Sequence, residues 1–336
     1  MDGADEIYLM DHPDSTEEIP IIDIAPFLAG EPGAAGRIGK ELRHVTETVG
    51  FFYLAGHGVP QSHIDMMFAE ARRFHALPLA VKEAIPRVDN TDYLRMSEAL
   101  TTTANIIDGA APNLNAAFIF NRERAPDDPD ALARKPFRQF NNWPEGLPGF
   151  KENVLDYLYT IEALGQRMLP LWAASLDLPA DYFAPFFKSP HITMRISHYP
   201  HQKVVGNRQY GLAPHTDNCL MTILAQANVP GLAVRMPSGH WRLVDIIPGT
   251  FVVNTGNLMV RWTNDRYLST KHRVINISET DRYVFPVFFG PDHDALIECL
   301  PTCTDAANPP RHKAMTYLDL MMQYFVMKQA KSTGSK

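Results

Sequence analysis

Residues 192–199 read ITMRISHY, and they open a long stretch, extending to about residue 297, in which β-branched and aromatic residues form short runs between turn residues. The further runs are CLMTILAQ (219–226), GLAVR (231–235), HWRLVDI (240–246), FVVN (251–254), LMVRW (258–262), HRVINI (272–277) and RYVFPVFF (282–289). Short strands at regular spacing are typical of an antiparallel sandwich or barrel. We therefore predict that each run is a strand and that this part of the chain is all β.

The chain before this stretch is helical in character. Apolar residues recur at helical spacing over 34–49 and again over 150–176, while 19–28 and 50–59 read as short strands and 86–116 as loop. Helices and strands are thus separated along the chain, which indicates an α+β protein. We divide it into a flexible tail (1–18), a helix-rich N-terminal region (19–185), a β core (186–298) and a C-terminal helix and tail (299–336).

Composition excludes several classes of protein. The 336 residues contain 31 Lys and Arg against 38 Asp and Glu, a net charge of −7, whereas a nucleic-acid-binding protein normally has a basic face. No apolar run reaches the length of a membrane span, so we expect no transmembrane helix. The first residues are acidic, whereas a signal peptide begins with basic residues. No obligate protein partner is evident. Three cysteines are too few for a disulfide framework, so we expect a cytoplasmic protein.

The motif His-x-Asp occurs three times, at His12–Asp14, His63–Asp65 and His215–Asp217. Two imidazoles and one carboxylate form the facial ligand set of an iron(II) oxygenase, and residues i and i+2 of a strand point to the same side. The first pair lies in the tail, and the second opens a helix, where i and i+2 diverge by roughly 200°. We therefore expect His215 and Asp217 to be the metal ligands.

A third ligand should come from a distant strand of the same sheet system. Four histidines follow Asp217 along the chain: His240, His272, His293 and His312. His272 opens a predicted strand far enough along the chain to return beside the first pair, while the others fall in turns or loops. Geometry alone leaves the choice open.

Arg282 stands at the head of the predicted strand RYVFPVFF. An arginine inside a barrel is costly unless it pairs with an anion, and its forked guanidinium suits a carboxylate. The alternative is a salt bridge at the rim.

Taken together, these residues resemble the iron(II)/2-oxoglutarate-dependent dioxygenase superfamily, in its isopenicillin N synthase-like branch, over about residues 19–325. The resemblance rests on segments that follow one another in the family's order: IPIIDIAPFL (19–28), VGFFYLAGHGVP (49–60), NNWPEGLPGF (141–150), LPLWAASLDLP (169–179), RISHYP (195–200), HTDNCLMTILAQ (215–226), HWRLVDIIPGTFVVNTGN (240–257) and STKHRV (269–274). It implies a double-stranded β-helix, or jelly-roll, core.

The resemblance also implies a site and a reaction. His215, Asp217 and His272 would hold Fe(II), while Arg282 and Tyr199 would hold the distal carboxylate of 2-oxoglutarate. With O2, the enzyme would oxidise a C–H bond of a small metabolite or natural-product intermediate and release succinate and CO2. Hydroxylation is the default outcome, and desaturation or cyclisation are the alternatives.

One departure concerns the cosubstrate. Relatives usually carry a serine two residues after the arginine, where this chain has Val284. Loss of that hydroxyl removes a hydrogen bond worth roughly 0.5–1.5 kcal/mol. Val284 is the one sequence feature that favours a rival function, an iron oxidase that does not use 2-oxoglutarate. A further alternative, from another class of protein, is a non-catalytic barrel that binds a ligand in its pocket.

Two residues are candidates for the substrate pocket. Phe288 shares the predicted inward face of Arg282, because the two are an even number of residues apart on one strand; it could equally be a plain core aromatic. Arg261, in LMVRW, would suit an acidic substrate if it points inward and would be a solvated strand residue if it points outward.

Overall fold

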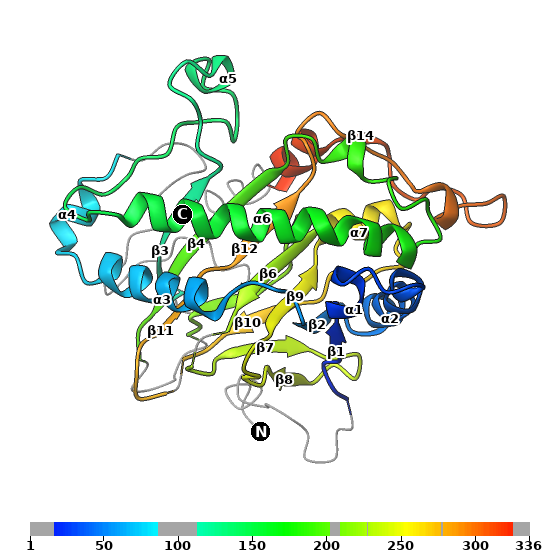
Figure 1. Cartoon of the computed structure of the whole chain (residues 1–336), viewed down its shortest axis with the longest axis horizontal. Helices are drawn as coiled ribbons and strands as arrows, with labels where there is room; N and C mark the ends of the chain where they lie inside the picture. Colours follow the sequence, from blue (N-terminus) through cyan, green and yellow to red (C-terminus); the bar gives the residue numbers. More distant parts are fainter. Residues whose placement is uncertain (1–16, 87–112, 202–208, 227, 277, 325–336) are drawn as a thin grey trace.

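The computed structural model describes residues 17–86, 113–201, 209–226, 228–276 and 278–324. His12, Asp14 and most of the predicted tail and 86–116 loop lie outside the described residues. Two β-sheets face each other, and helices cover the outer face of the larger one (Figure 1). This confirms the predicted α+β architecture with a jelly-roll core.

The major sheet has the order β1-β2-β9-β6-β12-β4-β11, and β3 pairs with β4. Its strands are β1 (Ile21–Asp23), β2 (Phe51–Ala55), β3 (Ala116–Asn121), β4 (His191–Tyr199), β6 (Met221–Ala225), β9 (Phe251–Thr255), β11 (Arg282–Val284) and β12 (Val287–Gly290). The helix-rich N-terminal region thus contributes β1, β2 and β3 to the same sheet as the β core.

The minor sheet has the order β5-β10-β7-β8 and is antiparallel throughout. Its strands are β5 (Leu212–His215), β7 (Leu232–Arg235), β8 (Trp241–Leu243) and β10 (His272–Val274). Apolar side chains of both sheets, including Tyr199, Val234 and Val284, pack in one buried cluster between them. A third, two-stranded sheet joins β13 (Leu296–Ile297) to β14 (Met315–Thr316).

The helices are α1 (Ala25–Leu28), α2 (Ala34–Thr48), α3 (Gln61–His75), α4 (Leu79–Glu83), α5 (Pro129–Leu132), α6 (Phe150–Ser175) and α7 (Asn257–Trp262), with short 3-10 turns η2 (Ala184–Phe186) and η3 (Pro301–Cys303). Residues 317–324 are also helical, as expected for the C-terminal region. No helix in the described part of the chain is long and apolar enough to cross a bilayer.

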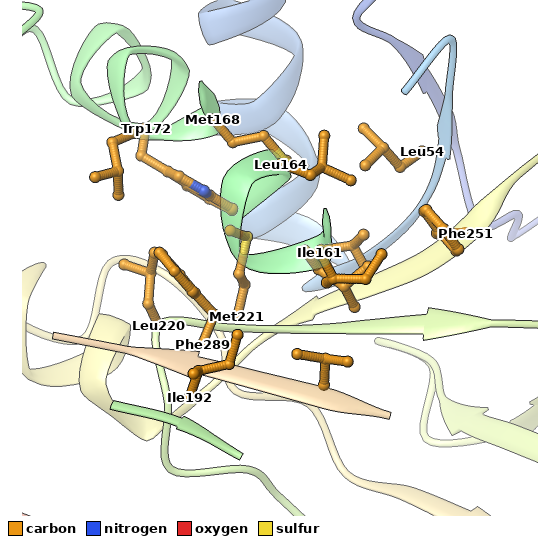
Figure 2. Close-up of a cluster of buried hydrophobic side chains, with 14 of the residues drawn as sticks. Leu54, Ile161, Leu164, Met168, Trp172, Ile192, Leu220, Met221, Phe251 and Phe289 are labelled. Atoms are coloured by element: carbon orange, nitrogen blue, oxygen red, sulfur yellow. The ribbon is translucent and has the colours of Figure 1, made fainter. Parts of the chain in front are cut away.

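Helix α6 is the main cover of the major sheet (Figure 1). Its apolar residues point down onto β4, β6 and β12, where Figure 2 shows Ile161, Leu164, Met168 and Trp172 facing Ile192, Met221 and Phe289. Helix α2 packs against α6 at Gly39, where an added Cβ would lie 2.9 Å from the backbone of Ala174. Glycine at this position therefore permits the close approach of the two helices.

Three strand predictions were wrong in detail. The stretch 19–28 forms strand β1 and then helix α1, with Pro26 in the first turn of that helix. LMVRW forms helix α7 instead of a strand, because Leu258, Met259 and Trp262 recur at helical spacing and are buried together. RYVFPVFF divides into β11 and β12 at Pro286, which has no N–H to donate. The two strands keep one continuous register against β4, since Arg282 pairs with Tyr199 and Phe288 with Thr193.

Truncating α6 at its buried face should destabilise the fold. Leu164 is fully buried, so Leu164→Ala is expected to lower the free energy of unfolding by about 2–5 kcal/mol through lost contacts and a residual cavity. Arg167, exposed on the same helix, is the matched control, and Arg167→Ala should change it by less than about 0.5 kcal/mol. Urea unfolding of both variants measures this, and equal losses would contradict the packing described.

Candidate functional site

His215, Asp217 and His272 lie together, and their ligand atoms are all within 4.8 Å of one another. Oδ1 of Asp217 lies 3.9 Å from Nε2 of His215 and 3.8 Å from Nε2 of His272. The two imidazole rings have centroids 4.2 Å apart. The structure thus brings together the three residues expected to bind a metal.

The minor sheet supplies the two histidines, and the segment between β5 and β6 supplies the aspartate. His215 ends β5 and is the direct register partner of His272, which begins β10, so the minor sheet presents both imidazoles side by side. Asp217 lies two residues beyond the end of β5, outside any strand, so the expectation that strand alternation places it was wrong. A backbone hydrogen bond from Asn257 to the Asp217 carbonyl, 2.7 Å long, holds this segment.

Hydrogen bonds orient each ligand atom. Nδ1 of His215 donates to the carbonyl of Ala213 at 2.9 Å, and Nδ1 of His272 faces the carbonyl of Thr270 at 3.2 Å. Because a carbonyl accepts only, each Nδ1 carries the proton and each Nε2 presents a lone pair.

The carboxylate of Asp217 is divided between two roles. Its Oδ2 accepts hydrogen bonds from the Thr222 hydroxyl at 2.6 Å and from the Asn254 amide at 2.8 Å. Thr222 and Asn254 are register partners on β6 and β9 of the major sheet. Oδ1 is left facing the two imidazoles of the minor sheet.

The electrostatics favour a metal-binding state. Burial, reinforced by the neighbouring His272, holds the pKa of His215 well below its usual value, so the ring is neutral at pH 7. Burial alone would raise the pKa of Asp217, but His272, His215 and the hydrogen bonds from Asn254 and Thr222 outweigh it and lower that pKa.

These donors fit a divalent transition-metal ion. Metal–ligand bonds to imidazole nitrogen and carboxylate oxygen are about 2.0–2.2 Å long, so atoms 3.8–3.9 Å apart can reach one ion between them. Two neutral imidazoles and one carboxylate are the donor set of non-haem Fe(II) oxygenases, which leaves further coordination positions open.

Arg282 and Tyr199 face each other across β11 and β4. Arg282 is 4% exposed, its Nε donates to the Val229 carbonyl at 3.1 Å, and its guanidinium carbon lies 5.4 Å from the centre of the Tyr199 ring. Nη1 of Arg282 is buried with no hydrogen-bond partner among the described residues. Burial lowers the pKa of Arg282 to about 10, so it remains charged at pH 7.

The other histidines considered for the site lie elsewhere. His240 is exposed in a turn, Nε2 of His293 lies 3.0 Å from Nδ1 of His191, and His312 pairs with Asp265. His63 is in helix α3 near Asp156, as its helical context indicated.

The register places Phe288 on the face of the sheet that also carries Arg282, as expected from their even spacing. Arg261 is on helix α7, and its Nη1 donates to the Lys313 carbonyl at 3.3 Å.

Sequence reasoning missed Thr222, Asn254 and Arg195. The first two become visible only with the cross-strand register that aims them at Asp217. Arg195 was detectable, since it lies four residues before Tyr199 in ITMRISHY and so shares its inward face.

Comparisons with known proteins agree with this geometry. Residues 19–146 match the family described as non-haem dioxygenase in morphine synthesis N-terminal, and residues 190–291 match the 2OG-Fe(II) oxygenase superfamily. The 2-oxoglutarate-Fe(II) type oxidoreductase hxnY of Emericella nidulans is 33% identical, over 90% of this chain and 88% of its own. The 2-oxoglutarate-dependent dioxygenase citB of Monascus ruber is also 33% identical, over 82% and 85%.

A solved structure gives the same answer. A full-length Neurospora crassa protein, crystallised in complex with alpha-KG and thymine, superposes with a TM-score of 0.81 at 25% identity, covering 92% of this chain and 96% of that one. The chain therefore belongs to the 2OG-Fe(II) oxygenase superfamily. It is an Fe(II)- and 2-oxoglutarate-dependent dioxygenase that uses O2 and acts on a small-molecule substrate.

Removing the Thr222 hydroxyl should weaken metal binding. Thr222→Val keeps the side-chain shape but removes the donor to Asp217, and loss of such an outer hydrogen bond typically costs about 10–100-fold in metal affinity. Thr255→Val is the matched control, because that buried hydroxyl on β9 donates to the Leu268 carbonyl instead. Calorimetric titration with Co(II) measures both, and equal affinities would contradict the role given to Thr222.

Proposed function

We propose that His215, Asp217 and His272 are the protein ligands of the catalytic Fe(II). The observation that carries this assignment is the convergence of two Nε2 lone pairs from the minor sheet and one Oδ1 from the segment between β5 and β6, each group held by a hydrogen bond on its other atom. When bound, iron and 2-oxoglutarate supply the oxidation of a C–H bond by O2, with release of succinate and CO2. The chain supplies the orientation of the ligand atoms.

Arg282 and Tyr199 are proposed to hold the distal carboxylate of 2-oxoglutarate. The support is a buried, charged guanidinium whose Nη1 has no hydrogen bond to another described residue. Its Nε is anchored on Val229, which leaves the outer nitrogens to bind an anion. Such an arrangement costs free energy unless a carboxylate completes it.

Ser197 is proposed to replace the hydroxyl that relatives carry at position 284. Val284 and Ser197 are direct register partners on β11 and β4, so their side chains lie on one face with Cβ atoms about 4.5–5.5 Å apart. Ser197 is 1% exposed and shares the face of Tyr199, two residues further along β4. The hydroxyl is thus kept beside the arginine but moved to the neighbouring strand.

The rival functions have less support. An oxidase that does not use 2-oxoglutarate is disfavoured because the relatives compared above are named as 2-oxoglutarate-Fe(II) type or 2-oxoglutarate-dependent enzymes. A non-catalytic binding protein would not need three oriented metal ligands.

We infer that the enzyme hydroxylates a small metabolite or natural-product intermediate, in a pocket whose floor includes Phe288. A pocket role for Arg261 stays a prediction.

The setting of the enzyme is also a proposal. We infer that it needs no nucleic-acid, membrane or obligate protein partner and works in the cytoplasm. The support is its net charge of −7 and three cysteines that are all unpaired, as expected in a reducing compartment.

Anaerobic addition of 2-oxoglutarate to the Fe(II)-loaded protein tests the assignment of ligands. The parent should show a visible metal-to-ligand charge-transfer band, and His272→Ala should abolish it because one ligand is lost. His240→Ala, at an exposed histidine of the same sheet region, should leave the band unchanged. A band that survives in His272→Ala, or is absent from the parent at saturating 2-oxoglutarate, would contradict the proposal.

The role of Ser197 can be tested by moving the hydroxyl. Ser197→Ala should weaken 2-oxoglutarate binding by roughly 2–10-fold, the equivalent of one hydrogen bond of about 0.5–1.5 kcal/mol. The double variant Ser197→Ala/Val284→Ser should recover the affinity of the parent. Titration of the charge-transfer band gives each dissociation constant, and an unchanged value in Ser197→Ala would refute this role.

A further inference from the structure

Arg195 is a second interior cation on the floor of the jelly roll. It lies in the middle of β4, where Ile192, Met194 and Ile196 point into the core beneath α6. Strand alternation therefore directs Arg195 to the opposite face, together with Ser197 and Tyr199. That face is the one proposed above to bind 2-oxoglutarate.

The contacts of Arg195 hold it in place without neutralising it. Its Nη2 donates to Oδ1 of Asn115 at 2.7 Å, and the amide of Asn115 donates to the Gly211 carbonyl. Asn115 is 1% exposed, so the guanidinium is fixed by a buried, neutral residue. Among the described residues, Nε of Arg195 is buried without a hydrogen-bond partner, and no ion pair joins this side chain to a carboxylate.

Arg195 belongs to the same surface of the sheet as the proposed cosubstrate site. On β4 it lies four residues before Tyr199, with Ser197 between them on the same face. Tyr199 is the direct register partner of Arg282 on β11, so both guanidinium groups are carried by the inner face of the major sheet.

The charges of the proposed site leave Arg195 unbalanced. A ferrous ion beside the carboxylate of Asp217 carries one net positive charge. 2-Oxoglutarate, with two carboxylates, turns this into one negative charge, which Arg282 balances. With Arg195 included, the net charge of the assembled site is therefore +1. An interior arginine without an anion is unfavourable, so one further negative charge would stabilise the site.

We propose that Arg195 binds the carboxylate of the substrate, and that the enzyme acts on small organic monocarboxylates. This inference rests on the proposed function. Phe288 is a diagonal neighbour of Arg195, since it pairs with Thr193 on β4 while the backbone N–H of Arg195 donates to the Pro286 carbonyl. Diagonal side chains are about 7–8 Å apart at Cα, so one small acid can contact the aromatic ring and the guanidinium together.

The carboxylate bound by Arg195 has two possible sources: the substrate, or 2-oxoglutarate itself. The observations favour the substrate, because Arg282 and Tyr199 already provide for the distal carboxylate and the metal for the other end. A variant of Arg195 should therefore change the affinity for the acid and leave that for 2-oxoglutarate unchanged.

The test uses the Ni(II)-loaded protein, which does not turn over, with saturating 2-oxoglutarate. Benzoate, nicotinate and phenylacetate are titrated calorimetrically, each beside its primary amide as a neutral partner of nearly the same shape. At least one acid is expected to bind ten-fold or more tightly than its amide. Arg195→Met should abolish the preference for the acid, and Arg195→Lys should retain part of it. In both variants the affinity for 2-oxoglutarate should stay within twofold of the parent value.

Several results would overturn the inference. These are acids that bind no better than their amides, an acid preference that survives in Arg195→Met, or a loss of 2-oxoglutarate affinity in Arg195→Lys. The comparison of acid with amide on the unaltered protein does not depend on any variant folding. If 2-oxoglutarate does not bind the Ni(II)-loaded parent, the proposed function itself is wrong. If 2-oxoglutarate binds but none of the acids does, only the role proposed for Arg195 is wrong.

Discussion

The site depends on how the carboxylate of Asp217 is shared between two sheets. One oxygen accepts hydrogen bonds from Thr222 and Asn254 on the major sheet, and the other faces His215 and His272 on the minor sheet. A buried carboxylate is unfavourable unless each oxygen has partners. The same bonds that stabilise its charge therefore fix the direction in which Oδ1 faces the two imidazoles of the minor sheet.

The two faces of the major sheet have separate tasks. Along β4, Ile192, Met194 and Ile196 are buried beneath α6, while Arg195 and Tyr199 occupy the inner face. Packing against α6 stabilises the sheet, so the inner face can carry polar and charged groups that would be costly in a core. The inner face of this sheet thus carries Arg195 and Arg282, for which we have proposed anionic ligands.

Much of this was predictable from the sequence. The position of His272 at a strand start and the inward face shared by Arg282 and Phe288 follow from residue type and strand period. The pair His215 and Asp217 was chosen correctly as neighbours, although Asp217 lies outside the strand that was expected to carry it. The sequence could not show that Thr222 and Asn254 donate to Asp217. Those depend on which residues become register partners, and that is decided by strands far apart in the chain.

The most direct test of the account is anomalous X-ray diffraction, near the iron edge, from crystals grown anaerobically with Fe(II) and 2-oxoglutarate. We expect one strong peak within bonding distance of Nε2 of His215, Nε2 of His272 and Oδ1 of Asp217. A peak bound by any other set of side chains, or no peak in this position from iron-replete protein, would contradict the assignment from which the rest of the mechanism follows.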